Sequence, residues 1–98
     1  METTKIALFK GKKIRKVIYQ NEWWFSVVDV VAVLTDSLDP NDYWYKMIIR
    51  MKSEENIELS TICRRLKLET PDGKMRETDC ATTEGIFRIV QSIAETKA

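Results

Sequence analysis

Histidine is absent from this chain of 98 residues, and cysteine occurs only twice, at Cys63 and Cys80. The chain therefore offers neither a histidine base for catalysis nor a Cys/His grouping with the spacing of a zinc site. It also lacks a nucleophile elbow, a glycine-rich phosphate loop and an acidic metal motif. We expect no enzymatic activity and no cofactor, and we interpret both cysteines as buried or half-buried free thiols in a reducing compartment.

Long apolar runs are missing as well. No segment approaches the roughly 20 apolar residues that a membrane-spanning helix needs, and the amino terminus lacks the apolar stretch of a signal peptide. These absences predict a cytoplasmic protein with no membrane partner. The 44% of hydrophobic residues in 98 positions is enough for one domain with a single core.

The net charge of +1 hides an uneven distribution of charge along the chain. Residues 1–20 carry six basic residues and one acid, whereas residues 21–45 carry five acids and no base. A balanced total does not exclude nucleic acid as a partner, because binding depends on where charge lies on the surface. We interpret the basic cluster at 10–16 as a solvated turn that protects a sheet edge, and a phosphate-binding hairpin is the alternative.

The segment 22–51 holds all three tryptophans and is expected to form the centre of the core. Residues 22–25 are aromatic and predict a strand. Ser26 followed by Asp29 is an acceptable helix start, so we favour a helix to about Thr35. The valines of this run would also suit a buried strand, and their spacing does not decide between the two.

A second helix is predicted from Pro40 onward. Asp39 is a suitable N-cap, Pro40 fits the first helical position, and Asp42 lies near the positive end of the helix dipole. Apolar residues then recur at steps of three and four, namely Tyr43, Trp44, Met47, Ile48 and Met51. The polar residues 52–56 are expected to form a surface loop. Two short helices of this kind, the second with bases on its outer side, have a shape that could dock on DNA.

Strands are also predicted on both sides of this helical region. Residues 6–9 and 14–20 would complete a three-stranded antiparallel meander with the aromatic strand. Residues 66–69 and 74–81 alternate on either side of a turn at 70–73, which predicts a β-hairpin with bases on one side of its second arm and acids on the other.

Two segments complete the prediction. Residues 57–65 suit either a short helix at 59–65 or an irregular segment. A last helix begins at Thr82 or Thr83 and buries Ile86, Ile89, Val90 and Ile93, and its Gly85 either permits close backbone approach or is harmless. The fold class is therefore α+β, a small antiparallel sheet (the amino-terminal meander plus the later hairpin) packed with three or four short helices.

Four segments follow one another in a characteristic order, namely residues 24–34, 43–46, 67–75 and 83–90. Together they are similar to the Bro-N domain, the amino-terminal domain of baculovirus Bro proteins and of bacterial prophage antirepressors. The resemblance covers nearly the whole chain, so residues 1–98 are expected to be a single Bro-N-like domain, cut short where similar domains continue into a further basic, aromatic helix. It implies DNA binding in phage or viral gene control.

We therefore predict a non-catalytic DNA-binding domain of a phage-type, antirepressor-like transcriptional regulator. Its expected nucleic-acid contacts are the bases of the second helix and of the hairpin region, Lys46, Arg50, Lys52, Arg64, Arg65, Lys67, Lys74 and Arg76. Taken singly, each base is also explained as a solvated surface charge. The alternative function is a protein-interaction module that captures a repressor without binding DNA, anchored by Trp23 or Trp24 and by Tyr45. A homodimer is the remaining partner that we consider.

Overall fold

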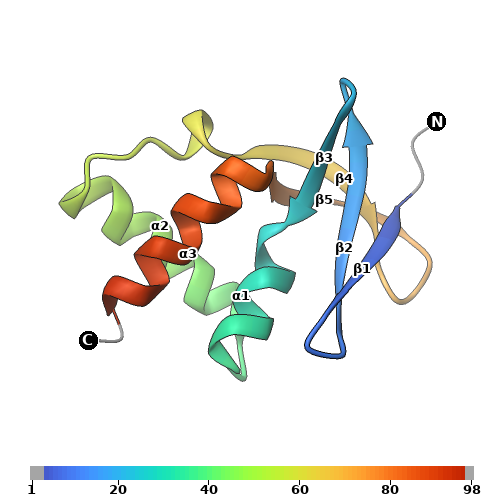
Figure 1. The fold of residues 1–98 in the computed structure, drawn as a ribbon, viewed down its shortest axis with the longest axis horizontal. Coiled ribbons are helices and arrows are strands. Elements are labelled where there is room, and N and C mark those ends of the chain that lie inside the picture. Colours follow the sequence, from blue (N-terminus) through green and yellow to red (C-terminus); the bar gives the residue numbers. More distant parts are fainter. Residues whose placement is uncertain (1–3, 97–98) are drawn as a thin grey trace.

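Strands form one antiparallel sheet, and the helices gather together on one side of it (Figure 1). The computed structural model describes residues 4–96 and the side chains of residues 4–94. The strands lie in the order β1-β2-β3-β5-β4 and are β1 (Lys5–Phe9), β2 (Lys12–Tyr19), β3 (Glu22–Ser26), β4 (Arg64–Glu69) and β5 (Met75–Ala81). The helices are α1 (Val27–Thr35), α2 (Pro40–Glu54) and α3 (Thr83–Thr96), and the 3₁₀ turn η1 covers Leu59–Thr61. The predicted α+β class is confirmed.

The predicted meander consists of β1, β2 and β3, which are joined by two-residue turns. Lys10 and Gly11 form the first turn with φ of 52° and 74°, and Gln20 and Asn21 form the second with φ of 52° and 64°. Two consecutive positive φ angles match the twist of paired antiparallel strands. The predicted hairpin is β4–β5, and it joins the same sheet because β5 pairs with β3.

Register and side-chain alternation define two faces of this sheet. Phe25 and its register partner Ala81 lie on the face covered by the helices. Val17, Leu68 and Cys80 lie on the opposite face, where they form a second, smaller core. The sheet curls around this core, and the backbone N–H of Glu69 in β4 donates to Oγ1 of Thr4 beside β1 at 3.0 Å.

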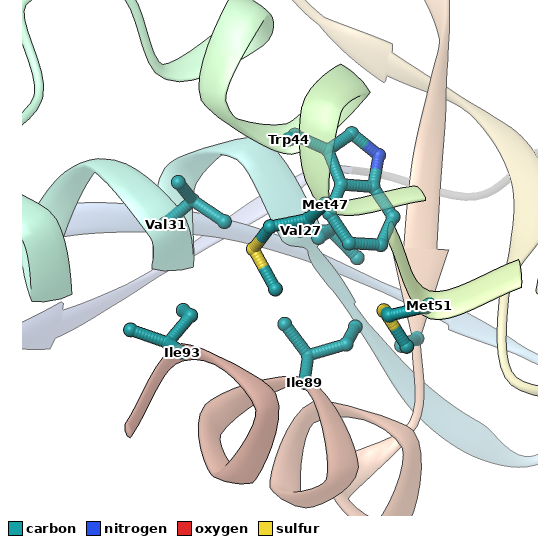
Figure 2. Packing of buried hydrophobic residues seen from close by; sticks show 8 residues of the cluster. Val27, Val31, Trp44, Met47, Met51, Ile89 and Ile93 are labelled. Atoms are coloured by element: carbon teal, nitrogen blue, oxygen red, sulfur yellow. The ribbon is translucent and has the colours of Figure 1, made fainter. Parts of the chain in front are cut away.

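The main core lies between the three helices and β5 (Figure 2). Its buried members are Val27, Val31, Trp44, Met47, Met51, Ala81, Ile89 and Ile93. The predicted apolar stripes of α2 and α3 are therefore confirmed, and the valine run of α1 is helical. The indole N–H of Trp44 donates to Oδ2 of Asp79 at 2.8 Å, so the polar atom of this buried ring is paired.

The predicted helix starts are confirmed in atomic detail. Oγ of Ser26 accepts a hydrogen bond from the backbone N–H of Asp29, and the Asp39 side chain accepts one from that of Asp42. The end of α2 was predicted too early, since the helix continues through residues 52–54. It ends where the chain reaches Asn56 at φ 54°, a left-handed conformation that asparagine tolerates well.

The segment before β4 is mostly irregular. Only Leu59–Thr61 forms a 3₁₀ turn, and β4 already begins at Arg64, so the helical alternative for 59–65 is wrong. The carbonyl of Ile62 packs against Gly85 in the first turn of α3, where a Cβ would lie 2.7 Å from the carbonyl oxygen. Gly85 therefore permits the close backbone approach that the sequence left open.

Candidate nucleic-acid interface

The three predicted contact residues of α2 have different surroundings. Lys46 is exposed and forms an ion pair with Asp42, Nζ to Oδ2, at 3.0 Å. Arg50 is half-buried, and its Nη2 donates to the carbonyl oxygen and to Oγ of Ser92 at 3.0 and 2.7 Å. Lys52 is exposed in the last turn. Arg50 thus joins α2 to α3, and two of the three predicted contacts in α2 already have partners within the domain.

The hairpin β4–β5 continues past the end of β3 as a two-stranded ribbon that curls back towards β1 and β2, where the carbonyl of Glu69 accepts from Arg15 Nη1 at 3.2 Å. Six residue pairs join β4 to β5, from Arg64 opposite Cys80 to Glu69 opposite Met75. Only two pairs join β5 to β3, and both lie at the end of β5. Most of the hairpin therefore extends beyond β3. We call residues 64–81 the ribbon.

One face of the ribbon carries charges of both signs. Arg65 Nε lies 3.4 Å from Oδ1 of Asp79, and Arg65 Nη1 lies 3.9 Å from Oε2 of Glu77. Lys67 is the register partner of Glu77 and points to the same face. The predicted contacts Arg65 and Lys67 are therefore compensated by acids of the neighbouring strand.

The other face is free of acids along its two strands. Arg64 and Arg76 belong to it by alternation, as does Lys74 at the start of the second arm, and all three side chains are exposed. Neither Lys74 nor Arg76 forms an ion pair with a residue in the described part of the chain. We call Arg64, Lys74 and Arg76 the basic face of the ribbon, because the fold brings together three of the eight predicted contacts there.

Two aromatic rings hold Arg64 in place. Its guanidinium carbon lies 5.1 Å from the ring centroid of Tyr19 and 5.9 Å from that of Trp24. Its Nη1 donates to the Tyr19 hydroxyl at 3.4 Å. The two rings meet edge to face at 6.3 Å, and the Trp24 indole N–H donates to the Tyr19 carbonyl at 3.2 Å. These cation–π contacts order the arginine without neutralising its charge.

An open hollow of about 840 Å³ lies beside Arg64 and reaches the first turn of α3. Arg88 lines it and is exposed, as predicted, but Glu58 and Glu84 line it too. Its charges therefore balance, which makes it a weaker phosphate site than the basic face. Sequence reasoning did not foresee these neighbours of Arg64, because they become adjacent only through the pairing of distant strands.

Another base lies beside the turn of the ribbon. Lys13 and Arg15 line a hollow of about 580 Å³ together with Thr70 and Pro71 of that turn. Arg15 is bound to Asp29 of α1, Nε to Oδ2 at 2.8 Å and Nη2 to Oδ1 at 3.0 Å, and this hydrogen bonding raises its pKa. Arg15 therefore joins β2 to α1. Lys13 is exposed beside the ribbon turn, and Asp29 and Glu69 also line this hollow.

The aromatic anchors of the alternative function lie on separate elements. Trp23 on β3 is 37% exposed and stacks under Lys16, whose Nζ lies 4.1 Å from the ring centroid. Tyr45 on α2 is 63% exposed. Trp24 is half-buried under Arg64. These rings do not form one apolar patch.

The cysteines are free thiols, with Cys63 half-buried and Cys80 buried, as predicted. Burial raises the pKa of each to about 12, so both remain protonated at neutral pH. Among the described side chains, those of residues 4–94, no three of the His, Cys, Asp or Glu type come together as a metal ion would need. None of the helices within residues 4–96 is long and apolar enough to cross a membrane.

Comparison with known proteins gives one match. A family model described as the BRO family, N-terminal domain, matches residues 13–98, which leaves out only the first 12 positions. No curated protein and no solved structure matches the chain significantly.

Proposed function

Because this chain belongs to the family of BRO N-terminal domains, we propose that it binds DNA and has no catalytic activity. It would be the DNA-binding domain of a phage-type, antirepressor-like transcriptional regulator that acts in the cytoplasm. The observation that carries the proposal is the basic face of the ribbon. Arg64, Lys74 and Arg76 lie exposed on one side of a two-stranded element, and no acid lies on that side of its strands.

The shape of the ribbon supports this proposal. The major groove of B-DNA admits a two-stranded antiparallel ribbon as well as a helix. Lysine and arginine that neutralise phosphates release counterions, which supplies most of the sequence-independent affinity. In this arrangement Lys74 and Lys13 contact the backbone near the ribbon turn, and Arg76 is the residue with the reach and the donors to address a base edge.

An arrangement in which α2 enters the major groove of DNA has less support. Arg50 donates its Nη2 to Ser92 of α3, and Lys46 is paired with Asp42. Using these bases on DNA would require breaking contacts within the domain. We therefore assign the main DNA contact to the ribbon and not to α2.

The experiment compares two double variants of equal charge change. Binding of a labelled mixed-sequence duplex is followed by fluorescence anisotropy over a range of salt concentrations, for the wild type, for K74E/R76E and for K46E/K52E. We expect the ribbon variant to bind more weakly and to lose roughly 1.8 units of log–log salt slope, about 0.9 for each phosphate contact. The α2 variant should keep the slope of the wild type.

Circular dichroism confirms that each variant is folded before it is interpreted. Equal losses in the two double variants would overturn the assignment to the ribbon and leave DNA binding itself intact. A wild type that fails to bind at low salt would reject the DNA-binding proposal altogether, and capture of a repressor protein would then be the function to test.

A further inference from the structure

An apolar groove lies on the helix-covered side of the sheet, between the β1–β2 hairpin and the helices α1 and α3. Its volume is about 380 Å³, and no charged side chain is among the described residues that line it. The lining residues include Ala7, Phe9, Phe25, Val30, Ile86 and Val90. The groove lies on the opposite face of the sheet from the basic face, so the proposed DNA contact does not use it.

Lysines of the β1–β2 hairpin lie on the same face of the sheet as this groove. Lys10 Nζ lies 5.7 Å from the ring centroid of Phe9. Lys16 is the register partner of Phe25, and Lys5 is the register partner of Lys16, so both point to the face that carries the groove. A complementary occupant would present an apolar side chain flanked by carboxylates.

The loop between α1 and α2 has this chemistry. Leu38 is fully exposed, at 105% of its reference area. Asp36 and Asp39 flank it, and Asp36 Oδ1 accepts a hydrogen bond from Lys12 Nζ at 2.7 Å. This ion pair places the loop beside the β1–β2 turn, at the same end of the molecule (Figure 1). Because Asp39 caps α2, both ends of the loop are held and Leu38 is presented on an ordered segment.

We propose that two copies of this chain form an isologous dimer in which Leu38 of each protomer occupies the apolar groove of the other. The α1 residue Leu34 lines the groove, and α1 ends at Thr35, so the loop that carries Leu38 begins directly after a residue next to the groove. A two-fold axis between them brings both contacts together at once. The exposed Asp39 beside Leu38 then faces the lysines on the groove side of the partner, while Asp36 stays paired with Lys12 of its own chain.

The contact is small, and this sets the expected affinity. One leucine on each side buries less than the roughly 800 Å² per partner of a standard stable interface. The dimer is therefore weak and depends on concentration and on salt, because part of the attraction is between exposed charges.

The test measures the association of the 98-residue chain by sedimentation equilibrium over a range of protein concentrations. Leu38→Glu should weaken dimerisation by about tenfold or more for each leucine removed from apolar contact, and Leu38→Met should preserve it. Ile49→Glu is the matched control, because it adds the same charge at an apolar residue of α2 that is 52% exposed. It should dimerise like the wild type.

A mixing experiment tests whether the groove is the partner site. Ala7→Trp fills the groove, and Phe9→Glu is a second blocking variant at a side chain that is 46% exposed. Neither blocked chain should self-associate, and neither should the Leu38→Glu chain. A mixture of one blocked chain with the Leu38→Glu chain should form heterodimers, because Leu38 of the blocked chain can still enter the open groove of the other. A strictly monomeric wild type, full dimerisation of Leu38→Glu, or a mixture without heterodimers would each overturn the proposal.

Discussion

The helix α2 and the ribbon both carry several bases, but the fold uses those bases differently. In α2, Arg50 donates to Ser92 of α3, and Lys46 is paired with Asp42 one turn earlier. In the ribbon, Lys74 and Arg76 are exposed and lie on the face that lacks acids. The same residue types therefore stabilise the domain in one element and remain available for a partner in the other.

The comparison teaches that charge counted along a sequence is not the charge available on a surface. Within the ribbon itself, Arg65 and Lys67 face Glu77 and Asp79, while Arg76 on the opposite face has no acid across from it. A shift of one residue in the register would reverse this division. Strand pairing therefore decides which bases can act on a partner.

The largest effect is expected where the two elements meet. Trp44 of α2 is buried and donates its indole N–H to Asp79 of the ribbon. Trp44→Ala should lower the free energy of unfolding by about 3–5 kcal/mol, because it leaves a cavity and removes the hydrogen bond to Oδ2 of Asp79. Urea denaturation measures this loss. Trp23→Ala is the control on an exposed ring, and a loss of similar size there would show that the α2–ribbon contact is not special.

A smaller loss of stability is expected at Arg50. Arg50→Ala removes the hydrogen bonds from α2 to Ser92 and should lower the free energy of unfolding by about 1.5–3 kcal/mol, with little change in DNA affinity of the folded protein. Lys52→Ala, two residues further on, should stay within about 0.5 kcal/mol of the wild type. Unchanged stability in the Arg50 variant would contradict its structural role.

The third prediction compares two arginines on opposite faces of the ribbon. Arg76→Ala should reduce the log–log salt slope of DNA binding by about 0.9, the value for one phosphate contact. Arg65→Ala should change the slope less, because Glu77 and Asp79 already compensate the Arg65 guanidinium. Anisotropy titrations of the two variants measure the difference. Equal slopes would remove the distinction between the faces.

The smallest effect is expected at Lys46. Its ion pair with Asp42 is exposed and spans one helical turn, so Lys46→Ala should lower the free energy of unfolding by only about 0.3–0.5 kcal/mol. Thermal unfolding at low and high salt should show the difference shrinking as salt increases. A decrease of more than 1 kcal/mol in the free energy of unfolding would contradict this, because it would require stabilising contacts of Lys46 besides the ion pair with Asp42.

Local chemistry made much of the fold predictable from sequence. Asp39 and Pro40 determine the start of α2 through a cap and a fixed φ angle, and both act within a few residues. The turn at 70–73 and the cap at Ser26 are recognisable for the same reason. The end of α2 was predicted too early because the polar residues 52–54 suit a loop as well as a last helical turn, and Asn56 is a weaker stop signal than glycine or proline.

Contacts between distant segments explain what the sequence did not reveal about the site. Ser26 and Asp29 were recognised as a helix start, but the binding of Asp29 to Arg15 required the placement of β2. Arg50 and Ser92 are 42 positions apart, and no local pattern relates them. The candidate contacts could thus be listed by residue type from the sequence, whereas their grouping into an available and an occupied set could not.

The short strand pairing between β3 and β5 affects how the chain reaches its native state. It joins Phe25 to Ala81 and Ser26 to Cys80, each more than 50 positions apart, whereas tight turns connect the strands of the meander and of the ribbon. Closing so long a loop is entropically costly and slow, while hairpins form within about 1–10 μs. The two hairpin units are therefore expected to fold early, and the docking of β5 onto β3 to be the late step that limits the folding rate.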